Sequence, residues 1–338
     1  MFNVGKPSSG RMLVLRLGAL GDIIHTLPAV ASLKHSFPGW NLTWIVESKW
    51  APLLEQNPFI DRVLVLDRGS PLGLGESWRQ LRASRYDFAV DFQGLVKSAL
   101  VASCARPERI FGFHHTQVRE RTAALFYSNK TVSRSVHTVD RNLDLAAAAG
   151  AGSAIRTFPL PPGRAESRLP AGDFVLGSPL AGWEGKQWPM SYYRELAALL
   201  HREMRLPLVL DGPPSAQSAF ALAPEAVPHT STLAGLIYAT RRALAVVGVD
   251  SGPLHIAAAL GKPGVAIYGP TDPARNGPYG DSLRVLRRPE AATAYKPSGA
   301  YKRASSVDES MMRISPGEVF EALRSVLGER RQTAGALP

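Results

Sequence analysis

The apolar positions of this chain fall into short buried runs that alternate with amphipathic segments. In the first half, strand-like runs cover residues 12–17, 42–46, 63–66 and 88–91, and helical patterns follow Ile23 and cover residues 78–84 and 95–104. In the second half, strands are predicted at residues 174–177, 207–210, 243–249 and 264–268, and helices at residues 192–203, 254–260 and 316–327. Strands that alternate with helices predict an α/β fold with doubly wound parallel sheets.

The two series are separated by a proline-rich stretch, residues 157–172 (TFPLPPGRAESRLPAG), which has no apolar period. This composition predicts a linker, and a chain of 338 residues has room for two domains. We therefore expect Rossmann-like domains at residues 12–160 and 173–315. A C-terminal helix at residues 316–328 could pack back on the N-terminal domain.

Bulk properties indicate a cytoplasmic protein. Cys104 is the only cysteine, so an internal disulfide is impossible, and it is expected to be a small buried residue. The apolar start of the chain is interrupted by Arg16, Asp22 and His25, which argues against a signal peptide. No uncharged apolar run of about 18 residues occurs. The first eleven residues are expected to be disordered, or to reflect a mis-assigned start.

The net charge of +11 favours acidic partners, such as nucleic acid, an anionic membrane surface or a phosphorylated substrate. The excess is concentrated in residues 94–141, which hold eight basic and three acidic residues and three histidines. A solvated basic face is the alternative interpretation of this segment.

A glycine-rich turn follows the first predicted strand, in the sequence LRLGALGDIIHTLP at residues 15–28. Gly18 and Gly21 let the backbone turn tightly and approach a ligand. Asp22 is either the N-cap of the next helix or a carboxylate at the carboxyl edge of the sheet. His25 lies one turn further on and is expected to pack there. The dinucleotide fingerprint G-x-G-x-x-G is absent.

A second motif, GSPLAGWEGKQWP at residues 177–189, runs from a strand end into a helix. Lys186 in this loop suits a diphosphate, because it carries a point charge on a long stem. The alternative is a solvated surface lysine, but Trp183 and Trp188 flank it and argue against that.

The third motif, VVGVDSGPLHIAAALGKPGVAIYGPTDP at residues 246–273, carries the clearest signal. A buried strand ends at Asp250, Ser251 and Gly252 turn the chain, and Pro253 fits the first helical turn. Free amides and the helix dipole form an anion site there, with His255 in the first turn. The next strand ends in a second turn, YGPTDP, at the same edge, so the two turns predict a diphosphate pocket.

Together with DFQGLVKSAL and RERTAALFY, these motifs resemble glycosyltransferase family 9, most closely its lipopolysaccharide heptosyltransferase I branch. The resemblance covers most of residues 12–328. It implies a GT-B architecture of two Rossmann-like domains that face each other across a cleft. It also implies inverting transfer of heptose from ADP-heptose to the Kdo of the lipopolysaccharide inner core, with the acceptor on the N-terminal domain and the donor on the C-terminal domain.

The same resemblance implies roles for individual residues. Asp22 takes the place of the general base, and Lys186 that of the phosphate-binding lysine. The remaining donor residues are Asp250, Ser251, Gly252, His255 and Thr271, and the acceptor residues are Gly18, Gly21, Arg119 and Arg121. No cofactor or metal is implied. The expected partners are an ADP-sugar and an anionic glycolipid, with peripheral contact at the inner membrane surface, no nucleic acid and a monomeric enzyme.

Two positions depart from the pattern of the family. Ala234 stands where a carboxylate for the nucleotide ribose is expected, and the loop before Lys186 reads PLAGWEG rather than a threonine-rich form. A family 9 transferase with another nucleotide sugar or acceptor therefore stays open.

Two further classes are weighed against a transferase. A Rossmann oxidoreductase is disfavoured because the fingerprint and a ribose-binding acid after the second strand are missing. A nucleic-acid-binding module is disfavoured because the basic residues are not interleaved with stacking aromatics.

Overall fold

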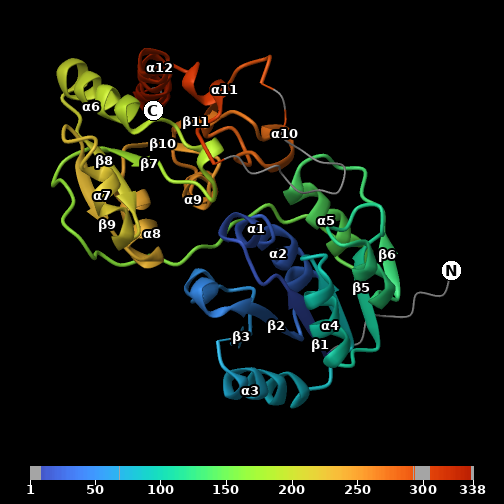
Figure 1. Ribbon diagram of the computed structural model, residues 1–338. Coiled ribbons are helices and arrows are strands. Elements are labelled where there is room, and N and C mark those ends of the chain that lie inside the picture. The colour runs from blue at the N-terminus through green and yellow to red at the C-terminus, as the bar shows by residue number, and fades with distance from the viewer. Residues whose placement is uncertain (1–8, 68, 292, 294–304, 336–338) are drawn as a thin grey trace. The chain divides into compact units, whose positions relative to one another are not determined.

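The computed structural model describes residues 9–67, 69–291, 293 and 305–335, the side chains of 330–335 excepted (Figure 1). Of the first eleven residues, 1–8 lie outside the described residues, whereas the first strand already begins at Gly10. The chain divides into two compact units, Met1–Pro159 and Leu160–Pro338. The division falls inside the proline-rich stretch 157–172.

The first unit is built on a sheet of six parallel strands. Along the chain these are β1 (Gly10–Leu15), β2 (Trp40–Glu47), β3 (Arg62–Leu66), β4 (Phe88–Asp91), β5 (Arg109–Phe113) and β6 (Asn129–Thr131). Their order in the sheet is β3-β2-β1-β4-β5-β6. The order reverses between β1 and β4, which therefore lie side by side.

Helices cover both faces of this sheet. The helices are α1 (Leu20–Ile24), α2 (Leu27–Ser36), α3 (Pro71–Arg82), α4 (Val96–Cys104) and α5 (Thr138–Ala148), with 3-10 turns η1 (Ser48–Leu54) and η2 (Arg121–Phe126). Leu81 of α3, Ala99 of α4 and Ala123 of η2 share one core cluster with Ala89 of β4. Phe37, at the end of α2, contacts the ring of Phe88, which points to the opposite face because successive strand residues alternate. Helices α2 and α5 pack together on that face.

The second unit repeats the arrangement. Its strands are β7 (Val175–Ser178), β8 (Leu208–Gly212), β9 (Val227–Thr230), β10 (Ala245–Val249), β11 (Gly264–Tyr268) and β12 (Leu283–Arg287), in the order β12-β11-β10-β7-β8-β9. Its helices are α6 (Met190–Met204), α7 (Gln217–Phe220), α8 (Leu233–Arg242), α9 (Gly252–Ala259), α10 (Pro273–Asn276), α11 (Glu309–Met312) and α12 (Pro316–Gly335), with 3-10 turns η3 (Glu184–Lys186) and η4 (Pro214–Ala216). Each sheet thus has a doubly wound strand order.

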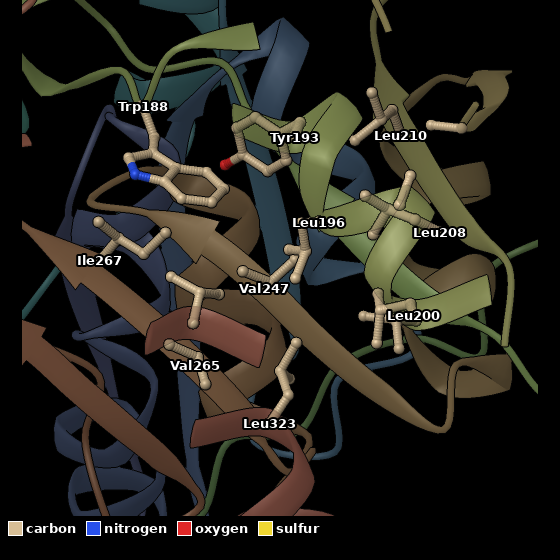
Figure 2. Packing of buried hydrophobic residues seen from close by; sticks show 14 of the residues in the cluster. Trp188, Tyr193, Leu196, Leu200, Leu208, Leu210, Val247, Val265, Ile267 and Leu323 are labelled. Carbon is tan, nitrogen blue, oxygen red and sulfur yellow. The ribbon is translucent and has the colours of Figure 1, made fainter. Parts of the chain in front are cut away.

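The hydrophobic core of the second unit lies between its sheet and the helices α6 and α12. Figure 2 shows Trp188, Tyr193 and Leu196 packed with Val247 of β10 and Leu323 of α12. Helix α12 contacts α6, β11 and β12, so it packs within the second unit. The apolar residues of α12 are buried in the core of that unit. Packing of this helix on the N-terminal domain stays a prediction.

Most of the predicted elements are present with shifted ends. The strands predicted at residues 88–91 and 264–268 match β4 and β11 to the residue. The first strand ends at Leu15, two residues earlier than predicted, and the helix expected after Ile23 is divided into α1 and α2. No helix in the described part of the chain is long and apolar enough to cross a membrane.

Candidate active site

Most of the predicted site residues follow the strands at which the order of each sheet reverses, whereas Arg119 and Arg121 follow β5 and Thr271 follows β11. Ligands of open α/β sheets bind beyond the carboxyl ends of the strands at such a point. In the first unit, Gly18, Gly21 and Asp22 follow β1. In the second unit, Lys186 lies in the loop after β7, and residues 250–255 follow β10.

Asp22 is the third residue of α1 and not its N-cap. The cap position is held by Ala19, whose backbone N–H donates to Asp22 Oδ2 at 3.3 Å. Asp22 Oδ1 also accepts from the guanidinium of Arg16 at 2.8 Å, and the side chain of Asp22 is 36% exposed, against 9% for Arg16. The carboxylate is thus fixed from the protein side by a buried cation while it stays accessible from the solvent side.

Arg16 and Gln93, which the sequence analysis did not single out, shape the turn around Asp22. The guanidinium of Arg16 also donates to the backbone oxygen of Phe92. Gln93 Oε1 accepts from the backbone N–H of Leu17 at 3.0 Å and of Gly18 at 3.4 Å. The loop after β4 therefore holds the glycine turn after β1. Position 18 requires glycine because a Cβ there would lie 2.7 Å from the indole nitrogen of Trp50.

The loop after β4 is held in turn by Asp91, which is fully buried. Its carboxylate accepts from the backbone N–H groups of Gln93 and Gly94 and from the hydroxyls of Ser98 and Tyr127, the last two at 2.8 and 2.7 Å. Burial raises the pKa of Asp91, although these hydrogen bonds oppose the shift. Burial and the neighbouring Asp91 raise the pKa of the Tyr127 phenol as well. Asp91 therefore organises the loop without facing solvent.

The other predicted residues of the first unit differ in exposure. His25 is 3% exposed and its ring lies edge-on to His137 at 5.4 Å, so it packs against the start of α5, as expected. Arg119 and Arg121 are exposed. The loop that carries them is tied to the loop after β4, because the backbone N–H of Glu120 donates to the carbonyl oxygen of Gly94 and its carboxylate accepts from the N–H of Val96.

In the second unit, Lys186, Asp250 and His255 form a charged cluster. Lys186 Nζ lies 3.0 Å from Asp250 Oδ2, and His255 Nε2 lies 3.8 Å from Asp250 Oδ1. The side chains are 15%, 11% and 7% exposed, in that order. Lys186 is therefore not a solvated surface lysine. Its ammonium also lies 5.8 Å from the ring centre of Trp183.

The electrostatics of this cluster favour an ionised Asp250. Burial alone would raise the pKa of the Asp250 carboxyl, but His255 and Lys186 outweigh that effect and lower its pKa to about 2. A carboxylate that is ionised in a buried position can hold two cationic or hydrogen-donating side chains at fixed places. Asp250 thus orients Lys186 and His255 at the start of α9.

The N-terminus of helix α9 has no side-chain cap. Ser251 holds the N-cap position in an extended conformation but makes no capping hydrogen bond, and Gly252 and Pro253 form the first turn. Within the described residues, Ser251 Oγ and Thr271 Oγ1 are buried and have no hydrogen-bond partner. Buried hydroxyls are normally paired. Ser251 adjoins the helix amides at the start of α9, which attract anions, and Thr271 follows the neighbouring strand β11. Unpaired hydroxyls at these places suit an oxygen-rich ligand.

Hydrogen bonds to the segment before α12 hold the loop that carries Lys186 in place. Trp188 is 1% exposed, and its indole N–H donates to the backbone oxygen of Ile314 at 2.9 Å. Tyr192 donates to the backbone oxygen of Met312 at 3.2 Å. Trp188 is thus a core residue that fixes the loop, whereas Trp183 is only partly buried. In the part of the chain with described side chains, no group of three or more His, Cys, Asp or Glu residues could hold a metal ion.

Comparison with known proteins decides the family. The family model of glycosyltransferase family 9 (heptosyltransferase) matches residues 75–300. The chain belongs to glycosyltransferase family 9. This glycosyltransferase is 30% identical to lipopolysaccharide heptosyltransferase 1 of Escherichia coli strain K12, over 82% of this chain and 94% of the relative. It is 32% identical to lipopolysaccharide heptosyltransferase 1 of Pseudomonas aeruginosa, over 80% of this chain and 82% of the relative.

Solved structures agree with this assignment. The structure of E. coli heptosyltransferase WaaC with ADP superposes with a TM-score of 0.74 at 25% identity, covering 93% of this chain and 99% of that one. The structure of the same protein with ADP-2-deoxy-2-fluoro heptose gives a TM-score of 0.72 at 25% identity, with the same coverage. The family 9 transferase therefore has the GT-B architecture expected from its sequence, and it is an enzyme.

Proposed function

We propose that this transferase moves heptose from ADP-heptose to the Kdo of the lipopolysaccharide inner core, with inversion at the anomeric carbon. The observation that carries the proposal is the open start of α9, where the buried, unpartnered hydroxyl of Ser251 follows directly on Asp250, which holds Lys186 and His255. The second unpartnered hydroxyl, that of Thr271, lies in the turn after the neighbouring strand β11. The ADP and ADP-heptose analogue bound to the E. coli relative support this choice of donor.

The donor diphosphate is proposed to bind at the α9 start. The amides of Gly252 and its neighbours and the hydroxyls of Ser251 and Thr271 donate to phosphate oxygens. Lys186 offers three N–H donors, so it can keep its bond to Asp250 and still bind phosphate. As ADP leaves, the charge that develops on its terminal phosphate is stabilised by the same groups. Asp250 acts by holding Lys186 and His255 in place.

Asp22 is proposed to be the general base. An acceptor hydroxyl attacks the anomeric carbon opposite the leaving diphosphate and must lose its proton as the new bond forms. A carboxylate that accepts a hydrogen bond from that hydroxyl can take the proton. Asp22 is exposed enough for this contact, and Arg16 fixes its orientation. Arg119 and Arg121 are exposed cations suited to an anionic acceptor.

The diphosphate is proposed to need no divalent metal, because Lys186 and the α9 start supply positive potential and the sequence has no D-x-D triplet. The enzyme is further proposed to act as a cytoplasmic monomer with peripheral contact to the inner membrane surface. Activity that EDTA abolished and magnesium restored would contradict the metal-independent proposal.

A family 9 transferase with another nucleotide sugar or acceptor is the second candidate. Ala234 at the start of α8 favours it, because a methyl group cannot bind a ribose hydroxyl.

A transfer assay decides between the two candidates. The enzyme is given ADP-heptose, or other ADP-, UDP-, GDP- and CMP-sugars, with Kdo-lipid A as acceptor. The product is analysed by mass spectrometry and by the anomeric signals in its NMR spectrum. Heptose transfer from ADP-heptose with an inverted anomeric centre is expected. Turnover with a different donor alone would establish the second candidate.

A further inference from the structure

The two helical layers of the first unit differ in what they show to solvent. All large apolar side chains of α1, α2 and α5 are buried. The layer of α3, α4 and η2 exposes five of them instead: Leu72 (87% exposed), Leu74 (48%), Trp78 (42%), Leu100 (46%) and Leu125 (79%). We call these five side chains, with the basic residues among them, the outer face of the layer. Large apolar side chains that one layer exposes are candidates for an interaction site.

Basic residues accompany these apolar side chains. The three elements carry Arg79, Arg82, Lys97 and Arg121 against a single acid, Glu76. Glu76 pairs with Arg79, and Lys97 lies 3.7 Å from Glu47 of β2. The opposite layer is balanced, because α1, α2 and α5 carry two Lys or Arg residues and three Asp residues. Apolar and cationic side chains are therefore concentrated on the same layer.

Helix α3 shows the combination most clearly. Leu74 and Trp78 are one helical turn apart and lie on the same side, and the guanidinium of Arg82, one further turn on, is 5.9 Å from the ring centre of Trp78. Tryptophan and leucine with arginine on one helix are typical of helices that lie in the interface of a bilayer, where the rings sit at headgroup level and the cations meet phosphate. The N-terminus of α3 follows β3 at the carboxyl edge of the sheet, the edge that also carries Asp22.

We infer that the outer face of the α3, α4 and η2 layer docks on the surface of a bilayer that contains anionic lipids. Leucine and tryptophan side chains enter the interface, and Arg79, Arg82 and Lys97 attract the lipid phosphates. This inference deepens the proposed function, because it assigns the membrane contact of that proposal to one face. A lipid-anchored acceptor would then be presented at the edge of the sheet that carries the proposed base.

The test measures binding of the full-length chain to sedimented vesicles, with no donor or acceptor present. Vesicles of phosphatidylglycerol and phosphatidylcholine should bind the protein, vesicles of phosphatidylcholine alone should bind it much less, and high salt should weaken binding. Leu72→Ser/Leu125→Ser should lower the partition coefficient by at least about tenfold, since both side chains lose apolar transfer into the interface. Leu222→Ser is the matched control, because Leu222 is 64% exposed in the second unit.

A second pair of variants tests the cations. Arg79→Gln/Arg82→Gln should weaken binding to the anionic vesicles roughly 30-fold. Arg202→Gln/Arg324→Gln is the control, since these side chains are 67% and 62% exposed in the second unit. Circular dichroism checks that all variants are folded. The inference is overturned if the wild type does not bind the anionic vesicles, or if either layer variant binds as well as its control.

Failure here can be told apart from failure of the proposed function. Transfer to a soluble, deacylated acceptor does not require the vesicle surface, so the variants Leu72→Ser/Leu125→Ser should retain wild-type kcat/KM in that assay. Loss of vesicle binding with retained soluble transfer supports docking by this face. A wild type that transfers sugar but ignores anionic vesicles leaves the proposed function intact and removes the docking inference.

Discussion

At the scale of single residues, a substitution at Asp22 can distinguish a structural role of its carboxylate from a catalytic one. Its carboxylate accepts from Ala19 and pairs with Arg16, yet it remains one-third exposed. Asp22→Asn keeps an acceptor oxygen for the Ala19 amide but cannot take a proton. We expect kcat to fall by about 10²–10⁴-fold, the range for general acid–base catalysis, with the donor Kd unchanged. Steady-state kinetics and calorimetry with ADP measure the two quantities. A variant that melts early but turns over normally would reveal a purely structural residue.

Lys186 is expected to contribute to donor affinity. Lys186→Ala should raise the donor Kd roughly ten- to hundredfold, because a charge-assisted contact with phosphate is lost. The variant also leaves the Asp250 carboxylate buried without its ammonium partner, which lowers stability. Lys186→Ala/Asp250→Asn removes that effect, so it should recover thermal stability but not affinity. Arg202→Ala, exposed in the same unit, is the control. A donor Kd like that of the control would exclude contact of Lys186 with the donor.

Asp250 should make stability depend on acid pH. Its pKa is lowered in the folded state from 3.8 to about 2, so its contribution is complete above the unfolded pKa and is lost as the pH falls from about 4 to about 2. The shift corresponds to about 2 kcal/mol of unfolding free energy. Urea unfolding of wild type and Asp250→Asn between pH 5 and pH 2 measures it. The wild type should lose about 2 kcal/mol more than the variant. Parallel curves would show that the ion pair adds nothing.

At the scale of elements, the loop after one strand supports the loop after its neighbour. Gln93 follows β4 and accepts from the amides of Leu17 and Gly18 after β1. Gln93→Ala leaves both amides without this acceptor, so we expect a loss of about 1–3 kcal/mol in stability and a lower kcat with an unchanged donor Kd. Gln93→Glu keeps an acceptor oxygen and should lose less activity. Equal activity of Gln93→Ala and wild type would mean that the glycine turn holds its shape alone.

The elements also show what the sequence could predict. Central strands such as β4, β10 and β11 are buried on both faces, and such strands give continuous apolar runs that are easy to recognise. The strands β6, β9 and β12, which the sequence analysis missed, all lie at sheet edges. They are short or carry polar residues, as in NKT of β6 and LRVLR of β12. In β5, Gly112 breaks the pattern; a Cβ there would lie 2.3 Å from the Tyr127 ring.

The sequence predicted those features of the candidate site that depend on neighbouring residues, but not the contacts between residues far apart in the chain. Glycine turns and helix starts have signals within a few residues, so the turn at Gly18 and the start of α9 could be placed. The contacts of Arg16 with Phe92 and of Lys186 with Asp250 join residues 76 and 64 positions apart. They depend on which strands become neighbours, and no local pattern encodes that. Of the two places considered for Asp22, the N-cap is excluded, because the helix begins two residues before it.

At the scale of the whole molecule, the two units should respond to different ligands. ADP alone is expected to slow hydrogen exchange in residues 178–188 and 250–256, by up to ~100-fold at a ligand concentration of 100 Kd. Residues 16–22 and 91–94 should exchange as in the free enzyme. Exchange measured by mass spectrometry, with and without ADP, tests this division. Protection in the first unit and none in the second would reverse the assignment of the donor.

The shared strand order of the two sheets has an evolutionary consequence. Each unit carries its own reversal point, the place where open α/β sheets bind ligands. Under the proposed assignment, substitutions in the loops after β1 and β4 would change the acceptor while the donor unit is inherited unchanged. In a family with this architecture, the ligand specificity of one unit can change by substitution while the other unit stays the same. Chimeras that join the first unit of this enzyme to the second unit of a relative would test whether the two units can change independently.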